Sequence, residues 1–168
     1  MRIVASVALM LVCTSSIPVL AQPRPAGFPD VVGALRATPG CLGVETAQTS
    51  GGKRVIFAWF ESKKALVDWY HGDVHQKAMK TVFPHVTFDR QPLVDLADDG
   101  GPILTIVSVK FAGTPTEGAT PSIASIGIEL YGPLPGGVAV GERFAPQGLH
   151  VRGLREIPLG MVQGSTPR

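Results

Sequence analysis

The alternation of hydrophobic and polar residues along the chain predicts a small domain of mixed helices and strands. Apolar or alternating runs indicate four main strands, at 41–49, 55–60, 102–112 and 123–131. Apolar residues at helical spacing predict two helices, one at 28–37 and one from Lys63 onward. Short strands at 138–144 and 149–157 complete the pattern. The expected order is α, β, β, α, β, β with small extra strands, which is an α+β fold.

The second predicted helix holds most of the aromatic and histidine residues, and Ser62 suits its N-cap. On a helical wheel, the sheet-facing arc consists of Leu66, Val67, Tyr70, Val74 and Ala78. Trp69 falls on the opposite side, so we expect it to be exposed or to lie at a subunit contact. Gly72 costs roughly 1 kcal/mol inside a helix, and Asp73 suits the start of a new one. The segment is therefore either one helix or two helices that meet at Gly72.

The N-terminal residues have the pattern of a secretory signal peptide. Arg2 is followed by the apolar run Ile3–Cys13 and by small residues that end at Ala21. We expect residues 1–21 to be removed near Ala21 and the protein to be exported, to the periplasm or the extracellular space. The apolar run is too short for a membrane span. Residues 22–27 are a predicted Pro-rich tether, 28–157 the domain and 158–168 a loose tail.

Charge and cysteine content argue against nucleic-acid binding and against an intramolecular disulfide. The net charge is +2 and falls to +1 when Arg2 is removed, which gives no electrostatic basis for nucleic-acid binding. Cleavage also removes Cys13, so Cys41 has no partner for an intramolecular disulfide. Cys41 stands at the start of an apolar strand, where a buried, inert thiol is the expected state. A domain of this length can form its core without a disulfide.

Three short segments resemble the antibiotic biosynthesis monooxygenase-like family of dimeric α/β barrels. They are PGCLGVET at 39–46, VIFAWFESKKALVDW at 55–69 and DVHQKAMK at 73–80. The resemblance covers about residues 28–82. It implies a ferredoxin-like α+β sandwich that forms a homodimer.

The resemblance also raises a question of topology. The unit of the family is βαββαβ, yet only the Pro-rich tether precedes the first helix of this chain. The last strand of such a sheet lies antiparallel beside the first. A hairpin from 102–112 into 123–131 would fill the vacant position from the C-terminal half. We therefore expect a circularly rearranged version of the fold.

The resemblance implies a pocket between the sheet and the two helices. Trp59 and His75 match family positions that face this pocket. The haem-degrading branch of the family holds its cofactor with a Trp and a His, whose positions fall near Trp59 and on Met79. Methionine can also be an axial haem ligand. The quinone-forming branch uses no cofactor and acts on phenolic polyketides.

The residues alone suggest a soft metal site. His71, His75 and Met79 are spaced four apart and offer two imidazoles and a thioether, a ligand set that suits copper. Three roles stay open for this group: a metal site, the lining of a pocket without metal, and ordinary packing. The other two histidines, His85 and His150, have the sequence context of ordinary hydrogen-bonded residues.

Two functional hypotheses follow. The first is an exported, cofactor-independent monooxygenase, or a related small-molecule enzyme, acting on an aromatic or polyketide-like substrate. His75 would be its acid or base, and Trp59, Tyr70 and Met79 would contact the substrate. The second is a non-catalytic exported protein that binds haem or copper. The sequence contains no nucleophile elbow, phosphate-binding loop or dinucleotide fingerprint that would favour another reaction class.

Overall fold

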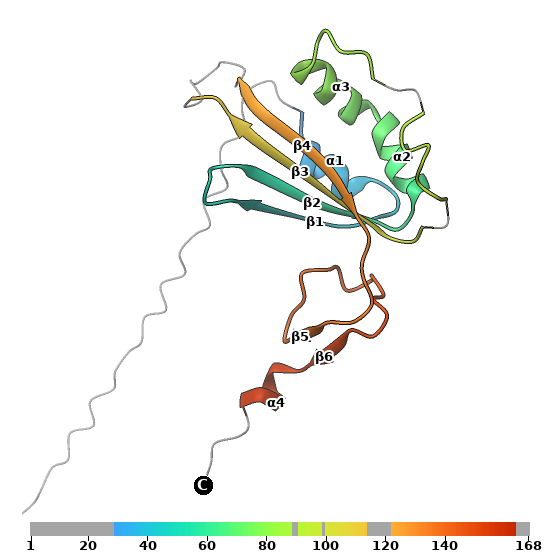
Figure 1. Ribbon diagram of the computed structural model, residues 1–168, viewed down its shortest axis with the longest axis vertical. Coiled ribbons are helices and arrows are strands. Elements are labelled where there is room, and N and C mark those ends of the chain that lie inside the picture. The colour runs from blue at the N-terminus through green and yellow to red at the C-terminus, as the bar shows by residue number, and fades with distance from the viewer. Residues whose placement is uncertain (1–28, 89–90, 99, 114–121, 164–168) are drawn as a thin grey trace, which may run out of the picture.

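The computed structural model describes residues 29–88, 91–98, 100–113 and 122–163 (Figure 1). Three helices lie on one face of a four-stranded antiparallel sheet, so the predicted α+β class is confirmed. The predicted signal peptide and tether lie outside the described residues. The elements are α1 (Val31–Ala37), β1 (Cys41–Gln48), β2 (Arg54–Phe60), α2 (Lys63–His71), α3 (Asp73–Val82), β3 (Ile103–Phe111), β4 (Ile123–Tyr131), β5 (Val138–Val140), β6 (Arg155–Ile157) and α4 (Leu159–Gln163).

Local sequence signals fix where the helices begin and end. The Asp30 carboxylate accepts a hydrogen bond from the Gly33 backbone N–H at the start of α1, at 3.0 Å. The Ser62 hydroxyl does the same for Ala65 at the start of α2, at 3.2 Å, as the sequence predicted. Gly72 has extended backbone angles, so α2 ends before it and α3 begins after it. The two-helix alternative is therefore the correct one.

The sheet is a meander with the strand order β1-β2-β3-β4. β2 pairs with β3 from Arg54 opposite Val109 to Phe60 opposite Ile103. β3 then pairs with β4 through the following hairpin. The C-terminal half of the chain thus supplies the neighbour of β2, as we expected. A circular rearrangement would, however, put β4 between β2 and β3, and that detail is wrong because β4 lies at the edge.

The hydrophobic core lies between the helices and one face of the sheet. Its fully buried centre is Phe60, at the end of β2, beside Ala58 of the same strand face. Leu35 of α1 and Leu66 of α2 pack onto this face. Burying side chains of this size stabilises the fold by about 1.5–3 kcal/mol each.

Trp69 belongs to this core, which corrects the expectation that it is exposed or at a subunit contact. It is 8% exposed and packs with Phe60 and Leu66. The helical wheel treats α2 and α3 as one continuous helix. Because the chain changes direction at Gly72, the residues of α3 say nothing about which side of α2 faces the sheet.

The opposite face of the sheet is partly covered by the segment that follows β4. The rings of Phe57 and Phe144 meet edge to face, with centroids 4.9 Å apart. A Cβ atom at Gly43 would lie 2.6 Å from Pro146, so this segment approaches the β1 backbone closely. Leu149 is buried here, at 2% exposure.

The C-terminal segment contains a small parallel pair, β5 with β6, rather than the longer strands predicted at 138–144 and 149–157. Arg143 holds it together. Its guanidinium donates to the carbonyls of Pro146 and Gln147 and forms an ion pair with Glu156 at 3.1 Å. The short helix α4 follows, with Met161 exposed. No helix in the described part of the chain is both long enough and apolar enough to cross a bilayer.

Candidate functional site

The break between α2 and α3 creates a site around the Tyr70 carbonyl. The last carbonyls of a helix have no partner within it. The carbonyl of Tyr70 accepts two side-chain hydrogen bonds instead, at 2.8 Å from Nδ1 of His75 and at 2.6 Å from Nε2 of Gln76. Two side chains from the first turn of α3 are thereby fixed to the end of α2.

This contact sets the tautomer of His75. A carbonyl oxygen can only accept, so Nδ1 of His75 must carry the hydrogen. In the neutral imidazole, Nε2 is then the unprotonated nitrogen with a free lone pair. His75 is therefore arranged to accept a proton or a hydrogen bond at Nε2.

Aromatic rings surround His75. Its ring centroid lies 5.5 Å from Trp69 and 5.1 Å from Tyr70. The Tyr70 ring also lies 5.1 Å from His71, edge to face. The half-buried imidazole thus packs against two aromatic rings, in a mostly apolar setting.

The pKa of His75 is lowered from its ordinary value of 6.5. The largest cause is burial, which disfavours the imidazolium. The hydrogen bond to the Tyr70 carbonyl acts in the opposite direction, and the nearby His71 lowers the pKa further. The neutral, basic form of His75 is consequently favoured near pH 7.

The predicted row of His71, His75 and Met79 is only partly preserved. His75 and Met79 are four residues apart within α3 and so share one face of that helix. His71 is exposed and belongs to α2, beyond the break. Among the described residues, no group of three His, Cys, Asp or Glu side chains could hold a metal ion. A copper site that uses the Met79 thioether as a ligand stays a prediction.

Trp59 lies on the other side of the sheet from His75. Ala58 and Phe60 face the helices, and side chains alternate along a strand, so Trp59 faces the C-terminal segment. It is 7% exposed, and its Nε1 atom has no hydrogen-bond partner among the described residues. Trp59 and His75 therefore do not line one pocket, contrary to the arrangement that the resemblance implied.

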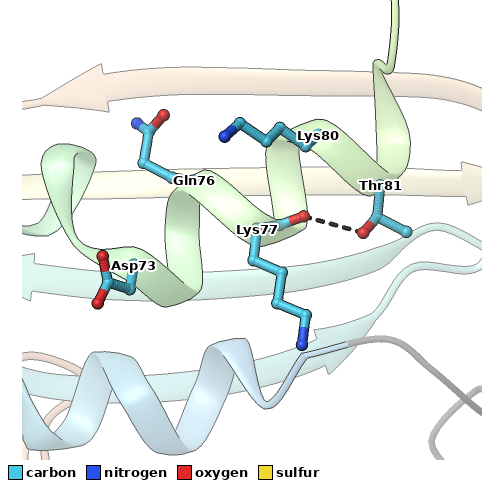
Figure 2. A pocket seen from close by; sticks show the side chains of 5 residues that line it. All are labelled: Asp73, Gln76, Lys77, Lys80 and Thr81. Carbon is cyan, nitrogen blue, oxygen red and sulfur yellow. Dashed lines mark hydrogen bonds between the residues drawn. The ribbon is translucent and has the colours of Figure 1, made fainter.

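Sequence reasoning missed Gln76, whose side chain joins the His75 site to an open hollow on α3. Figure 2 shows this hollow, which Gln76 lines together with Asp73, Lys77, Lys80 and Thr81. The Thr81 hydroxyl donates to the Lys77 carbonyl at 2.9 Å. The helix break at Gly72 indicates that a carbonyl needs donors, but the hydrophobic pattern does not show that the side chain of Gln76, four residues later, supplies one.

A second hollow lies on the far face, between β1 and the C-terminal segment. Its lining is Glu45, Thr46, Ala47, Phe57, Glu142, Arg143 and Phe144. Nε of Arg143 is buried there without a hydrogen-bond partner among the described residues. Partial burial raises the pKa of the Cys41 thiol, which disfavours its thiolate form.

Comparisons of this chain with models of known protein families, with curated proteins and with solved structures found no match.

Proposed function

We propose that the protein is a small-molecule enzyme similar to the antibiotic biosynthesis monooxygenases. It would be a cofactor-independent oxygenase acting on an aromatic, polyketide-like phenol. The observation that carries the proposal is the geometry of His75, whose Nδ1 is fixed on the Tyr70 carbonyl at 2.8 Å. That contact leaves Nε2 as a base within a cluster of aromatic rings.

The proposed chemistry begins with proton transfer to Nε2 of His75. Removing a proton from an activated phenol gives an electron-rich anion, which is the form that reacts with dioxygen. Oxidation of a CH₂ group to a carbonyl then balances as R₂CH₂ + O₂ → R₂CO + H₂O, without any cofactor. Tyr70 and Met79 would contact the substrate, while Trp59 would need a separate ligand because it lies across the sheet.

The proposal includes the exported location that the N-terminal pattern predicts and the homodimer that the resemblance implies. Neither is needed for the proton transfer at His75, so each can fail alone. Cell fractionation tests export through the appearance of a shortened chain outside the cytoplasm. Sedimentation velocity of the purified protein tests the homodimer, which a clean monomer at micromolar concentration would exclude.

Dioxygen uptake with a panel of phenols tests the chemistry. The matched variant is His75→Asn, because the asparagine amide can still donate to the Tyr70 carbonyl but has no basic nitrogen. Loss of a general base lowers the rate by about 10²- to 10⁴-fold. His85→Asn, an exposed position in a loop, should leave the rate unchanged. Equal rates in His75→Asn and wild type, or no uptake with any phenol, would contradict the proposal.

A second candidate is a non-catalytic haem- or copper-binding protein. It is favoured by the two imidazoles of His71 and His75, which both contact the Tyr70 ring, with ring centroids 5.1 Å apart in each case. Haem and copper are titrated separately while the absorption spectrum and the melting temperature are recorded. A ligand at a hundredfold excess over its Kd stabilises the native state by about 2.7 kcal/mol. No shift of the melting temperature with either ligand excludes this candidate.

A further inference from the structure

The hollow on the far face of the sheet is built from segments that are distant in the sequence. Glu45 of β1 and Phe57 of β2 are paired residues, so their side chains share this face. Glu142, Arg143 and Phe144 belong to the segment that covers it. The hollow has a volume of about 320 Å³, which is enough for a small organic molecule. It lies across the sheet from the helices and is therefore separate from the imidazole site between α2 and α3.

Arg143 brings to this hollow a hydrogen-bond donor that the fold leaves unused. Its side chain is only 10% exposed. Nη1 pairs with Glu156, and Nη2 donates to the carbonyls of Pro146 and Gln147. Nε is buried and has no acceptor among the described residues. A buried donor without an acceptor destabilises a protein, so its presence in the wall of a hollow indicates that a bound molecule supplies the acceptor.

Two carboxylates in the same hollow lack a cation. Glu45 and Glu142 are exposed, and neither carboxylate has an ion-pair or hydrogen-bond partner among the described residues. The charge of Arg143 is already balanced by Glu156, at 3.1 Å. The unbalanced charge of the hollow is therefore negative, which favours a cationic ligand.

Two phenyl rings form the apolar part of the hollow. Phe57 is half-buried beneath the C-terminal segment, whereas Phe144 is 55% exposed. An exposed phenyl ring offers apolar surface to a hydrophobic ligand, and its face also attracts a cation. The hollow thus combines an unused donor, two unpaired carboxylates and an aromatic surface.

We infer that the hollow binds a small organic cation in which an apolar body carries an ammonium group next to a carbonyl, as in the amide of an apolar amino acid. The ammonium group contacts Glu45 and Glu142, and the apolar body packs on the two rings. The carbonyl oxygen accepts a hydrogen bond from Nε of Arg143. Nε is shielded from solvent, so the carbonyl reaches it only with a small shift of the surrounding side chains. A metal cation would leave the rings and this donor unused, and the carboxylates would repel an anion.

The probe that tests the inference is L-phenylalaninamide, which carries all three groups. Titration of the purified protein, followed by the NMR signals of its backbone amides, locates the ligand and gives its Kd. A ligand of this size should have a Kd of about 0.1–5 mM. The largest shifts should fall on residues 45–47 and 142–144, which line the hollow.

Two related compounds each lack one group of the probe. N-acetyl-L-phenylalaninamide has no ammonium group, and the loss of two exposed ion pairs should weaken its binding by about 2- to 25-fold. Phenethylamine has no carbonyl group, and the loss of one hydrogen bond should weaken its binding by about 2- to 12-fold. Arg143 also holds the C-terminal segment together, so its donor is tested by this change in the ligand rather than by substitution.

The carboxylates are exposed and can be replaced without disturbing the fold. Glu45→Gln and Glu142→Gln should each raise the Kd of L-phenylalaninamide by about 1.5- to 5-fold. The control is Glu61→Gln, which removes the same charge from an exposed position outside the hollow and should leave the Kd unchanged.

Four results would overturn the inference. Absence of shifts around the hollow at about 20 mM L-phenylalaninamide excludes the site. Binding of the N-acetyl compound as tight as that of the probe, or a Kd that neither glutamine variant raises, excludes the carboxylates as the cation site. Equal Kd values for the probe and phenethylamine exclude Arg143 as the donor. Dioxygen uptake is measured separately and depends on the other face of the sheet, so its failure would leave this site untouched.

Discussion

Trp59→Phe tests whether a buried N–H group without a partner costs this protein stability. Two effects oppose each other. The phenyl ring is smaller than the indole by roughly 40 Å³, and at about 24 cal/mol per Å³ of cavity the loss is about 1 kcal/mol. The variant also removes Nε1, which is buried without a hydrogen-bond partner among the described residues. Such a group costs about 1–3 kcal/mol.

The two effects nearly cancel or favour the variant, so the free energy of unfolding of Trp59→Phe should fall by less than about 1 kcal/mol, or rise. The matched control is Trp69→Phe. Trp69 is equally buried, but its indole nitrogen is not among the buried atoms that lack a partner. Trp69→Phe should therefore cost at least the cavity energy of about 1 kcal/mol.

Urea unfolding at pH 7, followed by circular dichroism, gives both values. A Trp59→Phe variant that loses as much stability as Trp69→Phe, or more, refutes the reasoning. It would mean that the Trp59 N–H has a hydrogen-bond partner in solution.

Two further predictions concern pH and backbone conformation. The pKa of His75 is lower in the folded state than its ordinary value of 6.5, so the unfolded chain binds more protons as the pH falls through 6.5. The free energy of unfolding should therefore decrease in this pH range and level off below the folded-state pKa. In urea midpoints measured from pH 8 to 5, His75→Asn should reduce this slope. Gly40→Ala should cost more than Gly52→Ala, because both have φ near +77° but only at Gly40 would the new Cβ lie 2.5 Å from Cβ of Ala65. Equal urea midpoints for the two glycine variants would show that the contact at Gly40 relaxes without cost.

The positions of the main helices and strands followed from local patterns, whereas the order of the last two strands did not. The segments ILTIVSVKF and IASIGIELY are both apolar, equally long and joined as a hairpin. Either could therefore have been placed beside β2. The distinguishing signal was present, because β3 is apolar on both faces while β4 carries small or polar residues between its isoleucines. The resemblance instead favours β4 beside β2, and for this reason the predicted order was wrong.

The candidate site was only partly predictable. His75 could be singled out by its spacing and by the resemblance, but its tautomer depends on the Tyr70 carbonyl. Backbone groups leave no trace in a hydrophobic pattern, so Gln76 was missed for the same reason. The location of Trp59 could have been read from strand alternation, since Ala58 and Phe60 must share the face opposite to it.

The meander order also determines how the sheet can assemble. In the four-stranded sheet, each strand after β1 pairs with the strand before it in the sequence, so it can join an edge that already exists. The loop that each pairing closes is the connection between the two neighbouring strands. In the rearranged order, β2 and β3 would not pair with each other, and β3 could join the sheet only through β4. Here β4 is the last strand to be added, and β1, β2 and β3 can form without it. The β1–β2 pairing closes only a short connection, whereas β2 pairs with β3 across residues 61–102, so β1 and β2 can pair before the rest of the sheet is complete.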